Sequence, residues 1–343
     1  MDIKRKTVNF LSNFIPSARV RKDFRGYFLK SNHLKYGHIY PPIYDMNNCL
    51  KGLPNIYNEY GEKMDVFFIR DKHMATYPYA CPAPTYFLFD RYNVGLDVHF
   101  YTHNAMLERM GSPSKRYGML NESESIVPND YNIFRENKGL EKEFTAIFTY
   151  SEKILNEVEN AKFLPVCAVP WYGTELGGGV LDEHIYMHKI KNISICSSSK
   201  TMCLLHDYRI SCAYQCKNEG LADTYGTFDG GPMIKIAETL SDYRYSVVIE
   251  NYISPYFFTE KITNCFLSMT VPIYLGATRI GDFFNTDGII FISENDDIKK
   301  VLSQCTEKDY LSRIEAIKEN YYKAQAYRNI WDMMYNQYIR DAK

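Results

Sequence analysis

The 343-residue chain has no run of 18 consecutive apolar residues, the length that marks a candidate transmembrane helix. Its first residues, Met1 to Phe14, are basic, but their apolar part is too short and too polar for a secretory signal. The chain also has almost no net charge, −1 formally, so no global basic field favours nucleic acid or an anionic membrane. We therefore expect a cytoplasmic protein with no transmembrane segment and no nucleic-acid partner, and any anion site must be local.

The chain also lacks an even number of cysteines, which a full set of disulfide pairs would need. The chain has nine, spread from Cys49 to Cys305, and we expect them to be reduced thiols without disulfides. Two pairs have a four-residue spacing that a zinc site could use; they are His184 with His188 and Cys212 with Cys216. Neither pair has further ligands at standard intervals, so we expect no metal site.

The length exceeds what one hydrophobic core usually supports, so we expect two domains. From Val8 to about Pro170, short β-rich runs alternate with helix-compatible stretches, which predicts an α/β domain with a mostly parallel sheet. These runs are MDVFFIRD, TYFLFDR, DVHFYTH and FTAIFTY. The glycine-rich stretch PWYGTELGGG has no strand before it and no helix after it, so it is better explained as a hinge than as a phosphate loop.

The second half of the chain alternates strand and helix patterns more clearly. The predicted elements are the strand KNISIC, a helix over Asp207–Lys217 closing near Gly220, the strand ADTYG, the helix MIKIAETL, the strand YSVVI, a helix from Glu260 and the strand VPIYLG. This order predicts a second doubly wound domain, followed by one or two helices over Glu307–Ile339. The predicted divisions are 1–173, a hinge at 174–190, a ligand-binding domain at 191–305 and C-terminal helices at 306–343.

The helix after YSVVI carries a lysine, Lys261, in its first turn. Its apolar face consists of Ile262, Cys265, Phe266 and Met269, and Thr259 is an acceptable N-cap. A lysine there opposes the helix dipole by about 0.3–1 kcal/mol, and either solvation or a pair with Glu250 would explain it. Alternatively, free helix N–H groups and an ammonium at the carboxyl edge of a parallel sheet make a site for a diphosphate.

A second cation and a carboxylate belong near the same edge. Arg209 follows the strand KNISIC and could bind phosphate through two N–H groups, although it could equally be an ordinary surface arginine. Glu260 could accept hydrogen bonds from sugar or ribose hydroxyls. The residues thus predict a nucleotide-diphosphate site.

The run VVIENYISPYFFTEKITNCFLSMTVPIYLGATR resembles the donor-domain signature of the α1,3/α1,4-fucosyltransferases, glycosyltransferase family 10. That signature is a strand ending in Phe-Glu-Asn, a loop, Thr-Glu-Lys, Val-Pro and Leu-Gly. Upstream, HDYRISCAYQCKNEGLADTYG places an arginine before a Tyr-Gly pair at the distance found in the family, so the resemblance covers about Lys191 to Ile292. It implies a GT-B-like α/β fold, with two Rossmann-like domains facing across a cleft.

The resemblance also implies a donor and a set of donor residues. The C-terminal domain would bind GDP-fucose, with Lys261 and Arg209 neutralising the diphosphate and Glu260 holding donor hydroxyls. The other implied donor-pocket residues are Tyr225, Gly226, Glu250, Asn251 and Phe257. No tightly bound cofactor or divalent metal is implied, and the Asp-X-Asp triplet that some glycosyltransferases use to hold a metal occurs nowhere in the chain.

Phe257 departs from the family pattern, because a tyrosine is common at this position. A hydroxyl contact to the donor would then be missing, although Tyr256 could supply one. A related transferase with another nucleotide sugar is therefore an alternative.

The run YGMLNESESIVPND resembles the family's strand ending in Glu-Ser-Pro, which supplies the catalytic base, and FTAIFTYSEK with VPWYG resembles later landmarks. Glu122 would be the base, and Glu124, which replaces the proline, is the alternative. The expected activity is inverting transfer of fucose from GDP-fucose to a carbohydrate acceptor, in α1,3 linkage. A catalytically silent, glycan-binding relative is the remaining alternative.

Overall fold

The computed structural model describes residues 3–15, 58, 60–70, 84–90, 94–166 and 182–340. The chain forms two compact units: residues 1–79 with 83–118, and residues 80–82 with 119–343. The predicted hinge segment Pro170–Gly179 lies outside the described residues, and the domain boundaries derived from the sequence stay a prediction.

Six strands form the first sheet, in the order β2-β1-β3-β4-β5-β6. Their bounds are β1 Asp65–Arg70, β2 Phe87–Asp90, β3 Val98–Thr102, β4 Lys115–Leu120, β5 Ala146–Thr149 and β6 Ala161–Phe163. β1 pairs in parallel with β2 and β3, and β5 pairs in parallel with β6. The four β-rich runs of the sequence are strands, as predicted, whereas β6 was not predicted because three residues give no periodic signal.

The described helices in residues 3–166 are α1 (Ile3–Ser12), α4 (Ile133–Glu136) and α5 (Glu152–Glu157), with 3-10 turns at His103–Leu107, Pro128–Asn132 and Leu140–Glu143.

Aromatic side chains fill the core of the first unit. Phe67 packs against Phe87 and Phe100 with ring centroids 5.0 and 5.5 Å away, and Phe89 packs against Phe100 at 5.3 Å. All four rings are buried. These four aromatic residues therefore serve packing, with ring-pair contacts that add to the burial of apolar surface.

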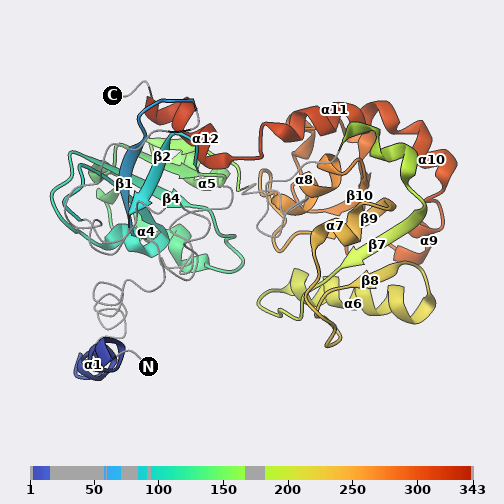
Figure 1. Ribbon diagram of the computed structural model, residues 1–343, viewed down its shortest axis with the longest axis horizontal. Coiled ribbons are helices and arrows are strands. Elements are labelled where there is room, and N and C mark those ends of the chain that lie inside the picture. The colour runs from blue at the N-terminus through green and yellow to red at the C-terminus, as the bar shows by residue number, and fades with distance from the viewer. Residues whose placement is uncertain are drawn as a thin grey trace. The chain divides into compact units, whose positions relative to one another are not determined.

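The second sheet has five strands in the order β11-β10-β9-β7-β8, and all its pairs are parallel (Figure 1). The strands are β7 (Lys191–Cys196), β8 (Asp223–Tyr225), β9 (Tyr243–Ile249), β10 (Val271–Leu275) and β11 (Ile290–Phe291). The connecting helices are α6 (Leu204–Glu219), α7 (Ile236–Leu240) and α8 (Glu260–Leu267). Each predicted strand and helix of this region is present, and α6 closes at Gly220 in the left-handed conformation.

Helices cover both faces of this sheet. Val247 and Ile249 pack with α6, while Val248, between them on β9, packs with α8 on the other face. Side chains on both faces are apolar, as the near-continuous run YSVVI predicts for a parallel strand. The predicted fold class, α/β with two parallel sheets and helices, is confirmed.

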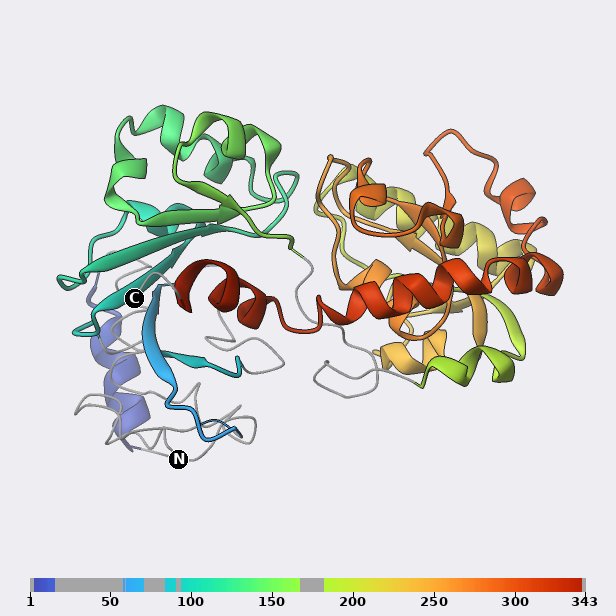
Figure 2. The ribbon, with the colours of Figure 1, turned by 90° about the horizontal axis from the view of Figure 1, so that it is seen from above.

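The C-terminal region is helical, as predicted. Its elements are α9 (Ile298–Leu302), α10 (Glu307–Ser312), α11 (Ile314–Gln325), α12 (Ile330–Met334) and a π-helical turn at Tyr335–Ile339. α11, orange-red in Figure 2, packs against α8.

Six cysteines lie in the described ranges, and all are free thiols: Cys196, Cys203, Cys212, Cys216, Cys265 and Cys305. No helix among the described residues is both long and apolar enough to cross a membrane.

Candidate functional site

Helix α8 begins at Glu260, directly after its N-cap Thr259, whose hydroxyl accepts a hydrogen bond from the Lys261 backbone N–H. Ile262, Cys265 and Phe266 are buried on the predicted apolar face. Met269 lies beyond the helix, because the backbone turns at φ 56° there, but its side chain is buried as expected. The sequence therefore predicts the start of α8 correctly and its end less well.

The Lys261 side chain is tied to a buried carboxylate. Its Nζ lies 3.1 Å from Glu250 Oε2 and 2.9 Å from Thr259 Oγ1. Glu250 is fully buried, and the Thr259 backbone N–H and hydroxyl both donate to its carboxylate, at 2.8 Å each. The pair with Glu250 that the sequence left open is therefore formed. It satisfies a carboxylate that would be costly to bury alone.

Arg209 reaches the same strand end from α6. Its Nη1 donates to the carbonyl oxygen of Ile249, the last residue of β9, at 3.1 Å. The side chain is buried, and its Nε atom has no hydrogen-bond partner among the described residues. Arg209 is thus not an ordinary surface arginine.

Burial and charge act in opposite directions on the two cations. Burial opposes the charge of Lys261, but the carboxylates of Glu250 and Glu260 raise the pKa of this ammonium above its usual value. Burial lowers the pKa of the Arg209 guanidinium, and Glu250 partly offsets this effect. Glu260 Oε1 lies 3.6 Å from Lys261 Nζ, so two cations and two carboxylates meet at this sheet edge.

Asn251 connects this edge to the loop after β4. Its backbone carbonyl accepts hydrogen bonds from the Ser125 hydroxyl at 2.8 Å and from the Cys203 thiol at 3.3 Å. The buried Asn251 Oδ1 atom has no partner among the described residues. Ser125 was not among the site residues predicted from the sequence, where it is marked only by its place after Glu124.

The two candidate bases differ in what they contact. Glu122 Oε1 accepts a hydrogen bond from the Ser123 N–H at 2.8 Å. Glu124 Oε2 instead accepts one from the Tyr252 hydroxyl at 3.3 Å, and Lys153 Nζ lies 3.7 Å from its Oε1. The carboxylate of Glu124 is therefore bound to the loop after β9, and that of Glu122 accepts a hydrogen bond from the next backbone N–H. Which of them acts as a base stays a prediction.

Phe257 is a packing residue in this structure. Its ring lies 4.9 Å from that of Tyr150 and 6.0 Å from that of Tyr252, measured between centroids, and it is buried. The Tyr150 hydroxyl in turn accepts a hydrogen bond from the Glu124 N–H at 3.0 Å. Phe257 thus supports the tyrosine that holds the Glu124 backbone.

Tyr225 and Gly226 lie at the end of β8. The Tyr225 hydroxyl is 2.6 Å from that of Tyr243, which donates to Asp223, so this network occupies the polar end of the Tyr225 side chain. Gly226 has φ +97°, and a Cβ atom there would lie 2.2 Å from the Ser197 carbonyl oxygen. Only glycine fits this close approach to the end of β7.

No group of three or more His, Cys, Asp or Glu side chains in the described ranges could hold a metal ion. His184 and His188 lie on the 3-10 turn Glu183–His188, where a four-residue spacing places them on different sides. Cys212 and Cys216 are core residues under the second sheet.

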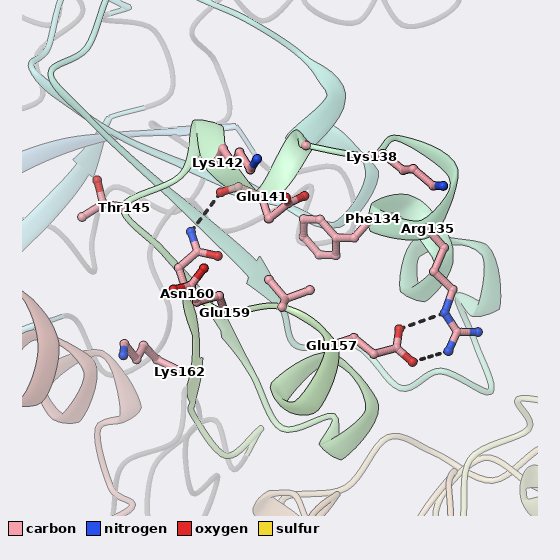
Figure 3. Close-up of a pocket in the computed structure, with 12 residues that line it drawn as sticks. Phe134, Arg135, Lys138, Glu141, Lys142, Thr145, Glu157, Glu159, Asn160 and Lys162 are labelled. Atoms are coloured by element: carbon pink, nitrogen blue, oxygen red, sulfur yellow. Dashed lines mark hydrogen bonds and ion pairs between the residues drawn. The ribbon is translucent and has the colours of Figure 1, made fainter.

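A pocket of about 680 Å³ lies elsewhere in the second unit and is lined by residues from the range 134–162 (Figure 3). The ion pair of Arg135 with Glu157 is on one side, and the Asn160 amide donates to the Glu141 carbonyl oxygen. Both lysines and glutamates line it, and none of the predicted site residues do. This pocket lies at the amino ends of β5 and β6, whereas ligands of parallel α/β sheets bind at the carboxyl ends of strands.

Residues 191–342 match the family model "Glycosyltransferase family 10 (fucosyltransferase) C-term". No curated protein sequence matches the chain.

The chain is distantly similar to several solved structures. An α1,3-fucosyltransferase with GDP has a TM-score of 0.46 at 13% identity, over 82% of this chain and 96% of that chain. Anabaena Alr3699/HepE with UDP and glucose has a TM-score of 0.49 at 10% identity, over 81% and 100%. TarM has a TM-score of 0.43 at 15% identity, over 71% and 53%.

The family model spans all five strands of the second sheet and contains Arg209, Glu250 and Lys261. Residues 191–342 of this chain are therefore similar to the C-terminal domain of glycosyltransferase family 10, the fucosyltransferase family, as the sequence motifs predict.

Proposed function

We propose that this protein is an inverting glycosyltransferase that moves fucose from GDP-fucose to a carbohydrate hydroxyl, in α1,3 linkage. One observation carries the proposal: two cations contact consecutive residues at the carboxyl end of β9. Arg209 donates to the carbonyl of Ile249, and Lys261 binds the carboxylate of the next residue, Glu250. Such a strand end, followed by a helix N-terminus, is where parallel α/β sheets bind phosphates. The family match over residues 191–342 supports the same conclusion.

In the proposed donor site, Lys261 and Arg209 bind the diphosphate of GDP-fucose. An ammonium has three N–H groups, and Lys261 uses two of them for Glu250 and Thr259. The third N–H and the unpartnered Nε of Arg209 supply donors to phosphate oxygens. Glu250 keeps the ammonium in place, and Glu260 accepts hydrogen bonds from the sugar. Asn251, Tyr225, Gly226 and Phe257 shape the pocket around them.

The proposed reaction is a single displacement. Glu122 takes the proton of the acceptor hydroxyl, whose oxygen attacks the anomeric carbon of fucose as the bond from that carbon to the β-phosphate oxygen breaks. GDP leaves with the bonding electrons, and the anomeric centre inverts. The two cations act most strongly on the charge that develops on the β-phosphate, which is why they lower the barrier. No metal ion takes part in the proposed step.

The test begins with the donor. We expect GDP-fucose to raise the melting temperature and to be slowly hydrolysed, whereas GDP-mannose and UDP-glucose have smaller effects. With GDP-fucose and a panel of oligosaccharides, the product should gain one deoxyhexose, and NMR should show an α1,3 linkage. Stabilisation by another nucleotide sugar and none by GDP-fucose would reject the proposed donor.

A further inference from the structure

We propose that His206, on the first turn of α6, donates a hydrogen bond from its Nε2 atom to the diphosphate of the donor. The inference rests on the proposed function, since it concerns the same donor site. It adds a neutral donor to the two cations that the sequence predicts there.

The ring has a defined tautomer. The backbone N–H of Met202 donates to His206 Nδ1 at 3.2 Å, so Nδ1 carries the lone pair and Nε2 carries the proton. Nε2 hydrogen-bonds to none of the described residues, and only 5% of the residue's surface is exposed. A largely buried ring, with one nitrogen fixed and with no protein partner for its other N–H, is suited to a ligand contact.

The location of His206 places it in the candidate site. It precedes Arg209 by three residues, so the two side chains share one face of α6. The thiol of Cys203, the N-cap of this helix, donates a hydrogen bond to the Asn251 carbonyl oxygen. The start of α6 therefore lies beside the loop after β9. α6 is long enough to have a developed N-terminal dipole, and its N-cap side chain does not cap the first N–H groups.

The surrounding charges keep the ring neutral. Burial and the positive charges of Arg209, Lys261 and Lys200 lower the pKa of His206 to about 4, and Asp207 opposes this only weakly. At neutral pH the ring therefore gives a hydrogen bond without a third positive charge beside Arg209 and Lys261. A donor of this kind strengthens as the leaving phosphate gains negative charge.

Two substitutions separate a ligand contact from a packing role. His206→Gln places an amide N–H near the position of Nε2, whereas His206→Asn places an amide oxygen near Nδ1 and removes the distal donor. We expect His206→Asn to weaken GDP binding by about 10- to 100-fold in calorimetry, the usual effect of a hydrogen bond to a charged group. His206→Gln should stay within about threefold of the unsubstituted protein.

The reverse order would overturn the inference, because it would show that the bond to Met202 matters and the Nε2 proton does not. Equal affinities in all three proteins would overturn it too. Lys261→Ala is the reference: if it weakens GDP binding while His206→Asn does not, the His206 contact is wrong and the proposed function stands. If the unsubstituted protein binds no GDP, both fail.

Discussion

The ammonium of Lys261 lies 3.1 Å from the carboxylate of Glu250, which is fully buried. About a third of the Lys261 side chain, 31%, is exposed, so this ion pair has one solvent-facing member and one buried member. A buried carboxylate holds its partner firmly because few alternative positions would satisfy it. The pair therefore provides a positioned cation at the start of α8.

Lys261→Ala should weaken GDP binding by at least about tenfold and lower turnover by about 100-fold or more, since it removes a cation from the leaving group. Calorimetry with GDP and donor turnover measure the two effects. Lys299→Ala is the matched control, because Lys299 forms an exposed ion pair with Glu219 at 2.9 Å. GDP affinity unchanged in Lys261→Ala would contradict the donor site.

Glu122→Gln should lower kcat by about 10²- to 10⁴-fold and leave GDP affinity unchanged, because an amide cannot take the acceptor proton. Glu124→Gln should have a smaller effect, since its carboxylate is held by Tyr252 and Lys153. Single-turnover transfer and GDP calorimetry check both variants. The opposite order of effects would assign the base to Glu124, and normal turnover in both variants would show that neither carboxylate is the base.

Gly226→Ala should destabilise the protein more than Gly230→Ala. Both glycines have positive φ, +97° and +86°, so each alanine costs about 1–2 kcal/mol of strain. Only Gly226 also lacks room, with the Ser197 carbonyl oxygen 2.2 Å from the Cβ position, whereas nothing lies within 4 Å at Gly230. The expected difference in unfolding free energy is about 2 kcal/mol, measured by urea denaturation. Equal losses would show that the close approach to β7 is not maintained in solution.

Lys189 should make stability depend on pH. Its buried Nζ donates to the Leu240 carbonyl and to Thr270 Oγ1, and burial lowers its pKa to about 7. Between about pH 7 and 10 the unfolded chain binds a proton there that the folded chain does not, so this residue makes the protein more stable as pH rises.

Lys189→Gln, which is uncharged throughout, should remove this contribution. The difference in unfolding free energy between Lys189→Gln and the unsubstituted protein should change by about 1 kcal/mol for each unit from pH 7 to 8.5. Denaturant titrations at fixed temperature measure it, with the exposed Lys299→Gln as control. Parallel stability curves for Lys189→Gln and the unsubstituted protein would show that Lys189 stays charged when folded.

The sequence by itself determined the order of strands and helices in the second half of the chain, the N-cap Thr259 and the place of Lys261 in the first turn of α8. These features depend on residues within one or two turns of each other, so periodicity and capping reveal them. The end of α8 was predicted less well, because Met269 keeps an apolar position although the backbone has already left the helix.

Only the tertiary structure decided which groups neutralise and hold one another. The sequence left the pair of Lys261 with Glu250 open, and nothing in it related Ser125 to Asn251, which is 126 residues away. The fixed tautomer of His206 depends on a backbone N–H four residues away, and its charge depends on cations from separate elements. Side-chain types near a strand end can indicate that a site exists. Burial and distance set each charge and each available hydrogen bond, and burial and distance arise only when the chain is folded.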